Sequence, residues 1–218
     1  MIELGVLKAL HGAKAGSDQE RWGKVIKATL ATARANGFKD APLSALTEFA
    51  IPEGAVLLPD ITMLSMSNEE MEKLADSTIG LNVGTWARDI IQRARTASSE
   101  GSQMLSLTAL DSRTMGLRAN YPTTKQVLER TKKFGDKISA EAMVKLAVEA
   151  AKGNIQVEIG KPLVGVMESI TDSDGHPSVL AIARRRDGLW LNALYANLGT
   201  QWDPGVQFVV SPPQVISS

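Results

Sequence analysis

The chain of 218 residues contains no cysteine, and only four Trp, two Tyr, four Phe and two His. It also carries no net charge, because 24 basic side chains balance 24 acidic ones. Without cysteine, a disulfide scaffold and a thiolate-ligated metal site are excluded. A hydrophobic fraction of 44 % at zero net charge excludes a disordered chain. The balance also argues against binding nucleic acid over the whole surface.

Long hydrophobic runs are missing as well. The longest charge-free stretches, 188–202 and 204–218, have fifteen residues each and are rich in small and polar residues. A membrane-spanning helix needs about 20 mostly apolar residues. Lys8 and His11 interrupt the N-terminal apolar run, so no secretory signal is predicted. We therefore expect a soluble, cytoplasmic protein with no membrane partner, no cofactor and no bound metal.

Apolar residues recur at helical spacing through the first two thirds of the chain. Two of the helical segments begin with the Ser-x-x-Glu spacing of a capping box, at Ser17 and at Ser67. Gly153 is typical of a helix end and closes the last segment. Five or six helices are expected in all, and the clearest cover 17–36, 67–75, 83–97, 124–134 and 139–153.

After Gly153 the pattern changes to the alternation of β-strands, separated by turn residues at 172–175 and 186–188. The expected strands cover 155–159, 162–170, 178–184, 189–197 and 206–210. The sequence thus predicts an α+β fold. A mainly helical region (1–153) is followed by a four- to five-stranded antiparallel β-meander (154–211) packed on it and by a flexible tail (212–218).

The charges are distributed in blocks of alternating sign. Residues 1–39 have seven basic and three acidic side chains, 40–80 one and eight, 81–137 ten and five, and 138–218 six and eight. Opposite patches could meet inside the fold or between protomers, and a head-to-tail contact would build a ring or a filament. The alternative is that these charges only solvate the outer faces of helices.

Catalytic signatures are sparse. The sequence has no phosphate-binding loop, dinucleotide fingerprint, nucleophile elbow or His-Glu-x-x-His motif. The glycine-rich stretch 12–17 has phosphate-loop residue types in the wrong order, which favours a flexible turn. His176-Pro-Ser178 has the His-x-Ser form of some phosphoesterases, but those enzymes need two such tripeptides and His11 is followed by Gly-Ala.

Two acidic patterns are equally incomplete. Asp172-x-Asp174-Gly resembles the start of a calcium loop without its later ligands, so a plain turn is favoured. Glu158 and Glu168 lie on neighbouring expected strands and could form a carboxylate pair of the glycosidase kind. The strand register needed for such a pair cannot be derived from the sequence.

The strongest candidate site is the basic run Arg184, Arg185 and Arg186, which enters a hairpin whose return strand carries Trp190. Arginines that hold phosphates beside aromatic rings that stack on bases form platforms for single-stranded nucleic acid. Tyr195 is expected on the opposite face, and edge protection by charge is the simpler interpretation. A second basic surface could join this site through the helical residues Arg88, Arg93, Arg95, Lys125, Arg130, Lys132, Lys133 and Lys137.

The sequence leaves three hypotheses for function. The first is a non-enzymatic structural or assembly protein that acts by self-association or by binding a protein partner. The second is a nucleic-acid-binding protein that uses Arg184 to Arg186, Trp190, Lys132 and Lys133. The third is an enzyme, such as a nuclease or transferase, with groups drawn from His176, Glu158, Glu168 and an arginine; its catalytic residues are unknown.

Overall fold

The structure is a computed structural model that describes residues 52, 54–95, 103–117 and 121–212. The chain divides into two units between Glu53 and Gly54, and every element described below belongs to the second. The expected helix at 17–36, the glycine-rich stretch at 12–17, His11 and the tail beyond 212 lie outside the described residues.

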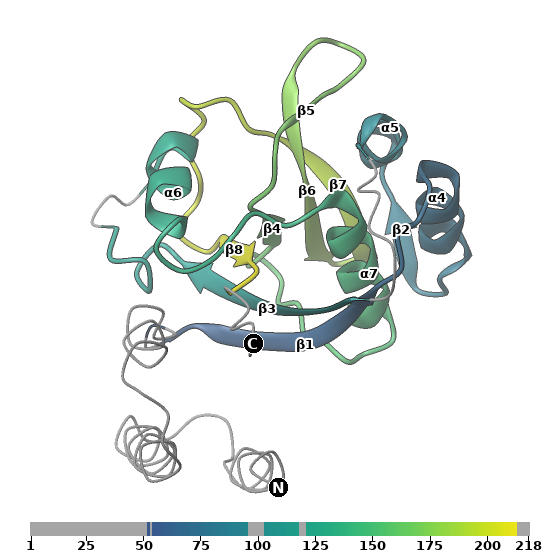
Figure 1. Ribbon diagram of the computed structural model, residues 1–218, viewed down its shortest axis with the longest axis horizontal. Coiled ribbons are helices and arrows are strands. Elements are labelled where there is room, and N and C mark those ends of the chain that lie inside the picture. The colour runs from purple at the N-terminus through teal and green to yellow at the C-terminus, as the bar shows by residue number, and fades with distance from the viewer. Residues whose placement is uncertain (1–51, 53, 96–102, 118–120, 213–218) are drawn as a thin grey trace, which may run out of the picture. The chain divides into compact units, whose positions relative to one another are not determined.

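The described residues form one curled, mixed sheet whose strands follow the order β1-β3-β8-β4-β6-β7-β2, with β5 paired beside them to β6 (Figure 1). Most neighbours are antiparallel, but β8 runs parallel to β4 and β2 runs parallel to β7. The strands are β1 (Val56–Met63), β2 (Leu81–Val83), β3 (Gln103–Asp111), β4 (Leu163–Gly165), β5 (Ile170–Thr171), β6 (Pro177–Arg185), β7 (Gly188–Tyr195) and β8 (Gln207–Val210).

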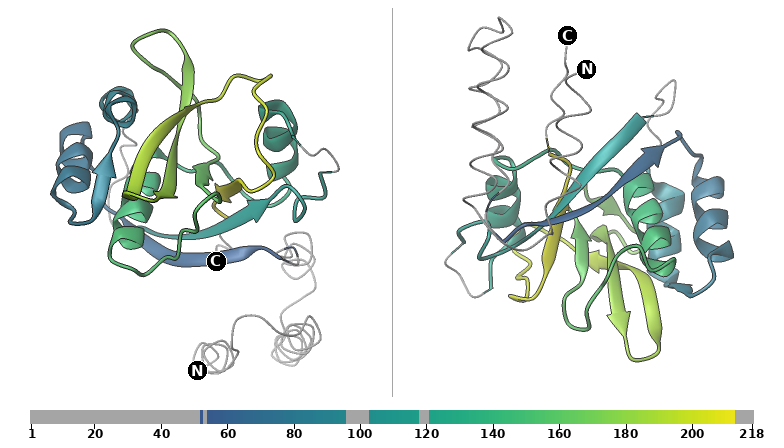
Figure 2. Two further views of the ribbon diagram at one scale, coloured as in Figure 1. Left: turned by 180° about the vertical axis from the view of Figure 1, so that it is seen from behind. Right: turned by 90° about the horizontal axis from the view of Figure 1, so that it is seen from below.

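Four helices pack on this sheet in the described part of the chain: α4 (Asn68–Ser77), α5 (Thr85–Arg93), α6 (Thr124–Thr131) and α7 (Ala140–Ala151). The apolar helix α7 contacts β1, β2, β6 and β7, so it lies inside the curl of the sheet. α4 and α5 pack together at the β2 edge, and α6 lies at the other end of the sheet (Figure 2).

Helices α6 and α7 cover opposite faces of the sheet. Gly165 faces α7, since a Cβ there would lie 2.8 Å from Met143 Cγ. Side chains alternate along a strand, so Val164 and its β8 neighbour Phe208 point to the other face. That outer face is where Thr124 of α6 accepts a 2.9 Å hydrogen bond from the indole of Trp202.

A nearly buried ion pair fixes α7 to the end of β1. Glu141 Oε1 lies 2.8 Å from Lys145 Nζ and accepts a 3.0 Å hydrogen bond from the backbone N–H of Leu64. Lys145 also donates to the carbonyl of Thr62. The pair therefore satisfies a backbone carbonyl within β1 and a backbone N–H just after it.

The four predicted helices that fall on described residues are confirmed; α5, α6 and α7 are shorter than predicted, whereas α4 extends to Ser77. The capping box at Ser67 is complete, because Ser67 Oγ accepts from Glu70 N at 3.2 Å and Glu70 Oε2 accepts from Ser67 N at 2.7 Å. The hairpin turn at 186–188 is also confirmed, with Arg185 opposite Gly188.

The predicted fold class is wrong. Three strands, β1, β2 and β3, lie in the region expected to be helical, and β8 inserts between β3 and β4 instead of ending a meander. β3 escaped recognition because its Met, Leu and Ala residues favour helix, while Pro59 and Asp60 in β1 are typical of a turn. The expected strand at 155–159 is reduced to one bridge, Ile159 with Arg184.

No helix in the described residues combines the length and the apolar character needed to cross a membrane.

Candidate binding site: an acidic pocket with aromatic walls

The turn between β5 and β6 is built by the side chain of Asp172. This carboxylate is buried, and its Oδ1 accepts the backbone N–H groups of Asp174 at 3.1 Å and His176 at 2.8 Å. Gly175 has φ +84°, a conformation that glycine adopts without strain. The sequence Asp-Ser-Asp-Gly therefore folds as a turn held by an aspartate, which leaves the side chain of Asp174 free to project.

Helix α5 holds this turn in place through Asp89. Its Oδ2 accepts the backbone N–H of Ser173 at 2.7 Å, and its Oδ1 accepts Arg93 Nε at 2.7 Å. The hydrogen bond from Arg93, aided by the one from Ser173, lowers the pKa of Asp89 below its usual value. The carboxylate thus stays ionised and links the turn rigidly to α5.

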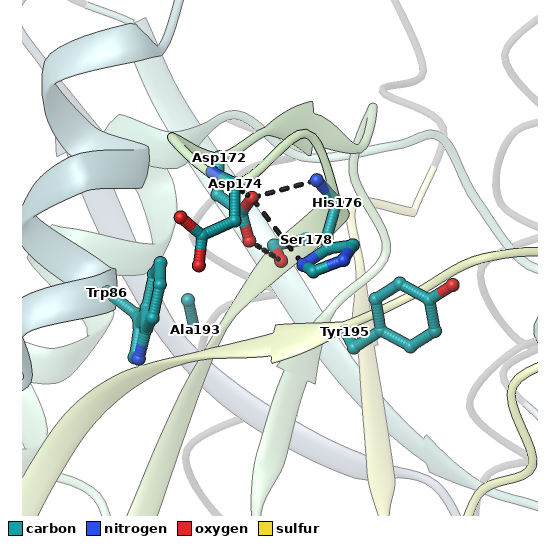
Figure 3. A pocket seen from close by; sticks show the side chains of 7 residues that line it. All are labelled: Trp86, Asp172, Asp174, His176, Ser178, Ala193 and Tyr195. Carbon is teal, nitrogen blue, oxygen red and sulfur yellow. Dashed lines mark hydrogen bonds and ion pairs between the residues drawn. The ribbon is translucent and has the colours of Figure 1, made fainter.

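A pocket of about 440 Å³ opens between this turn, α5 and β7 (Figure 3). Trp86, from the first turn of α5, and Tyr195, at the end of β7, stand on opposite sides of it, 49 % and 47 % exposed. The His176 ring meets Tyr195 edge-on, with centroids 5.7 Å apart. The lining residues are Trp86, Asp172, Asp174, His176, Ser178, Ala193 and Tyr195.

The two carboxylates of the pocket have different roles. Asp172 is used inside the turn, where its Oδ2 also accepts the Ser178 hydroxyl at 3.3 Å. The carboxylate of Asp174 has no hydrogen-bond donor or cation among the described residues, and it projects toward the side of Trp86 (Figure 3). The pocket therefore presents one uncompensated negative charge beside exposed aromatic rings.

His176, Ser178 and Asp172 do not form a catalytic triad, although they meet in this pocket. In a triad the histidine lies between serine and aspartate and takes the serine proton. Here Asp172 lies in the middle: it accepts the Ser178 hydroxyl, and its Oδ1 is 4.0 Å from His176 Nδ1. A carboxylate is a weak base, so this arrangement orients the hydroxyl without activating it.

The arginine hairpin lies at the other end of β6. The guanidinium carbon of Arg185 is 5.0 Å from the centre of the Trp190 ring, and Trp190 Nε1 donates a 3.0 Å hydrogen bond to Asp187. The strand register places Tyr195 on the opposite face from Trp190, as expected. The nucleic-acid role of Arg184, Arg185, Arg186 and Trp190 stays a prediction.

The second basic surface contains both free and paired side chains. Lys132 and Lys133 are exposed at the end of α6, and their nucleic-acid role also stays a prediction. Other members have partners in the fold: Arg88 with Asp76 at 2.7 Å, Arg93 with Asp89, Arg130 with the carbonyl of Met115, and Lys137 with Glu168 at 2.5 Å.

The charge blocks meet, in part, inside the fold. The acidic helix α4 lies against α5, where Arg88 pairs with Asp76 and lies 3.9 Å from Glu72. Some of the alternation in the sequence is therefore used to join two neighbouring helices.

The expected pair of Glu158 and Glu168 is not assembled. Each has its own lysine, Lys161 at 2.8 Å and Lys137 at 2.5 Å. Ile159 lies beside Arg184, at the C-terminal end of β6, whereas Glu168 precedes β5, which pairs with its N-terminal end. The length of β6 thus separates the two carboxylates.

A second hollow, of about 660 Å³, lies on the outer face between α6 and the sheet. It is mainly apolar, with Val127, Val164 and Phe208 among its lining residues and the Lys137–Glu168 pair beside them. The charged residues that line it, Lys137 and Glu168, are paired with each other, so it has no unpaired charge comparable to that of Asp174. We therefore interpret it as a gap in apolar packing and not as a binding site.

The sequence analysis singled out the turn and His176 but did not place Trp86 beside them. The buried positions of α5 are Ala87, Ile90 and Ile91, followed by Ala94, and this spacing places Trp86 at the edge of the buried stripe. The signal that the sequence offered for this wall of the pocket was a tryptophan in the first turn of a predicted helix.

Among the described residues, no group of His, Asp and Glu side chains is arranged to hold a metal ion. Comparison with protein-family models, curated proteins and solved structures found no match to this chain.

Proposed function

We propose that this chain is a non-enzymatic binding protein that engages a protein partner through the pocket beside the 172–176 turn. The partner's contribution is the guanidinium of an arginine side chain. The observation that carries this proposal is the uncompensated carboxylate of Asp174 beside the half-exposed rings of Trp86 and Tyr195.

A guanidinium fits the chemistry of this pocket better than an anion or an apolar group. The faces of Trp and Tyr rings attract cations, and arginine is the cation found most often on them. Its planar fork also donates two hydrogen bonds to one carboxylate. A site with one free carboxylate and two aromatic walls offers both interactions to the same group.

The molecule contains an internal example of the same grouping. At the arginine hairpin, Trp190 has Arg185 over its ring and Asp187 at its indole nitrogen. At the pocket, Trp86 and Asp174 supply the ring and the carboxylate, but no described residue supplies the cation. The internal example supports arginine as the missing member.

The strength of one such contact is modest. An exposed cation–π contact contributes about 0.5–1 kcal/mol, and an exposed ion pair about 0.2–1 kcal/mol. A single arginine would therefore bind with a dissociation constant in the millimolar range or weaker, since 1 mM corresponds to about 4.1 kcal/mol. A useful partner must add contacts around the pocket or present the arginine repeatedly.

A blocked Gly-Arg-Gly peptide tests the proposal, with the citrulline peptide as its uncharged counterpart. We expect the arginine peptide at millimolar concentration to shift the NMR signals of the Trp86 indole N–H and of the 173–176 backbone, and the citrulline peptide to shift neither. Asp174→Asn should abolish both shifts, and Trp86→Ala should abolish the shift of the 173–176 backbone signals.

Matched controls are available at the same kinds of residue elsewhere. Asp203→Asn makes the same charge change at an exposed position, and Trp190→Ala removes a ring outside the pocket. Both should leave the peptide response intact. Equal responses to the arginine and citrulline peptides, or a response that survives Asp174→Asn, would contradict the proposal.

The other two hypotheses have less support. Arg185 lies over the Trp190 ring, so on that face it competes with a base for stacking. Ser178 lacks a base that could activate it, as described above, so the pocket offers no activated serine for an enzymatic reaction.

A further inference from the structure

Resting on the proposed function, we infer that the partner is a second copy of this chain. The arginine hairpin, residues 184–187, of one copy docks at the pocket of the next, where Arg186 places its guanidinium against Asp174 beside Trp86. Repetition of this contact joins the copies head to tail.

Arg186 is the member of the basic run best placed to act between molecules. It lies in the two-residue turn between Arg185 and Gly188, at the tip of the hairpin, and it is exposed. It makes no hydrogen bond or ion pair with any described residue. Arg185, in contrast, is already stacked on Trp190. Arg186 is therefore a cation that the structure leaves available.

The tip of the hairpin cannot enter the pocket of its own chain. The 172–176 turn precedes β6 and the hairpin turn follows it, so the two lie at opposite ends of the strand (Figure 1). β6 has nine residues, which at about 3.3 Å per residue separate the ends by roughly 30 Å. Continuous pairing of β6 with β7, from Ser178–Tyr195 to Arg185–Gly188, keeps this separation fixed. The contact must therefore be intermolecular.

Charge complementarity favours this partner. The hairpin segment 184–187 has three arginines against one aspartate, whereas the 172–176 turn has two aspartates and no Lys or Arg. Between like copies, a basic tip and an acidic pocket steer each other into one orientation. Because the two surfaces differ, each docking leaves a free tip and a free pocket, which is the condition for a ring or an open filament.

The test uses the full chain and two variants. Arg186→Gln removes the positive charge at the tip of the hairpin, and Asp174→Asn removes the negative charge of the pocket. We expect the wild-type mass measured by light scattering to rise with protein concentration at low salt and to return to that of the 23.4 kDa monomer at high salt. Each variant alone should remain monomeric under conditions in which the wild type associates.

The mixture of the two variants is the decisive measurement. The Asp174→Asn chain keeps a working tip and the Arg186→Gln chain keeps a working pocket, so an equimolar mixture can form one contact only. We expect the mixture to stop at a dimer. Asp203→Asn is the control for the loss of one negative charge, and it should associate like the wild type.

The outcomes separate this inference from the proposed function. A wild-type chain that stays monomeric at all concentrations, while its pocket still responds to the arginine peptide, overturns the second-copy inference and leaves the proposed function standing. Association that survives both variants also overturns the inference, since it uses another surface. If the arginine peptide does not shift the NMR signals of the pocket, the proposed function is overturned. If Asp174→Asn loses association while Arg186→Gln still associates, the role of Arg186 is overturned.

Discussion

The two ends of β6 contain similar chemical groups in different states. At the C-terminal end, Trp190 has its cation, Arg185, and its carboxylate, Asp187, within the same hairpin. At the N-terminal end, Trp86 and Asp174 line a pocket that no arginine or lysine of the described chain enters. One end is complete within the fold, and the other is left open to solvent.

The comparison shows that residue types alone do not distinguish a structural contact from a binding site. In the sequence, the three arginines and Trp190 attract attention because they are close together. That closeness lets Arg185 and Trp190 satisfy each other inside a hairpin. The pocket is assembled from α5, the 172–176 turn and β7, which lie about 100 residues apart at the extremes, and this separation hides it in the sequence.

The largest effect should separate the two carboxylates of the 172–176 turn. We expect Asp172→Ala to lower the free energy of unfolding by about 2–4 kcal/mol, because it leaves two part-buried backbone N–H groups and the buried Ser178 hydroxyl without their acceptor. Asp174→Ala, which removes no hydrogen bond, should change it by less than about 0.5 kcal/mol. Urea unfolding of both variants measures the difference, and equal losses would contradict the division of roles.

The local elements of the fold were predictable for a physical reason. The capping box of α4, the glycine end of α7 and the 186–188 hairpin depend on residues within one turn of each other. The sheet depends on partners far apart in sequence. Val164 of β4 pairs with Ala181 of β6 on one side and Phe208 of β8 on the other. No pattern within a single strand specifies such neighbours.

β3 shows how local preference was overruled. Its Leu105, Leu107 and Ala109 alternate with polar or outer-face residues, the period of a strand, although these residue types favour helix. Leu107 and Ala109 are buried on one face of the sheet, and Thr108 and Leu110 are buried on the other, so burial outweighed propensity. The alternation was present in the sequence, but its meaning depended on the sheet that the strand joins.

The candidate site was predictable only as far as the Asp-Ser-Asp-Gly turn. The sequence indicates the turn and places His176 and Ser178 beside it, and in the structure both side chains line one pocket. The anchor provided by Asp89 is 84 residues away from Ser173. The opposing wall, Trp86, is equally distant, so neither could be assigned without the fold.

A smaller effect should distinguish the two tryptophans. Trp190→Ala removes the contact under Arg185 and the hydrogen bond to Asp187, and we expect it to lower the free energy of unfolding by about 1–2 kcal/mol. Trp86 has no hydrogen bond or cation of its own among the described residues, so Trp86→Ala should cost less. Thermal unfolding of the two variants side by side checks the order, and a larger cost at Trp86 would show that its main role is packing.

The smallest effect concerns the link between the pocket and α5. The pKa of Asp89 is lowered in the folded protein by Arg93 and by the Ser173 N–H. The link therefore stabilises the turn fully above the unfolded-state value of about 3.9 and is lost as the pH falls through the lower folded value. We expect the NMR shift of the Ser173 amide to titrate with a midpoint below about 3.9. In Asp89→Asn the titration should disappear, with a stability loss below about 1 kcal/mol because the pair is partly exposed. A midpoint at or above the ordinary aspartate value would mean that Asp89 of α5 does not fix the turn. The relative position of Trp86, on α5, and Asp174, on the turn, would then no longer be explained by this link.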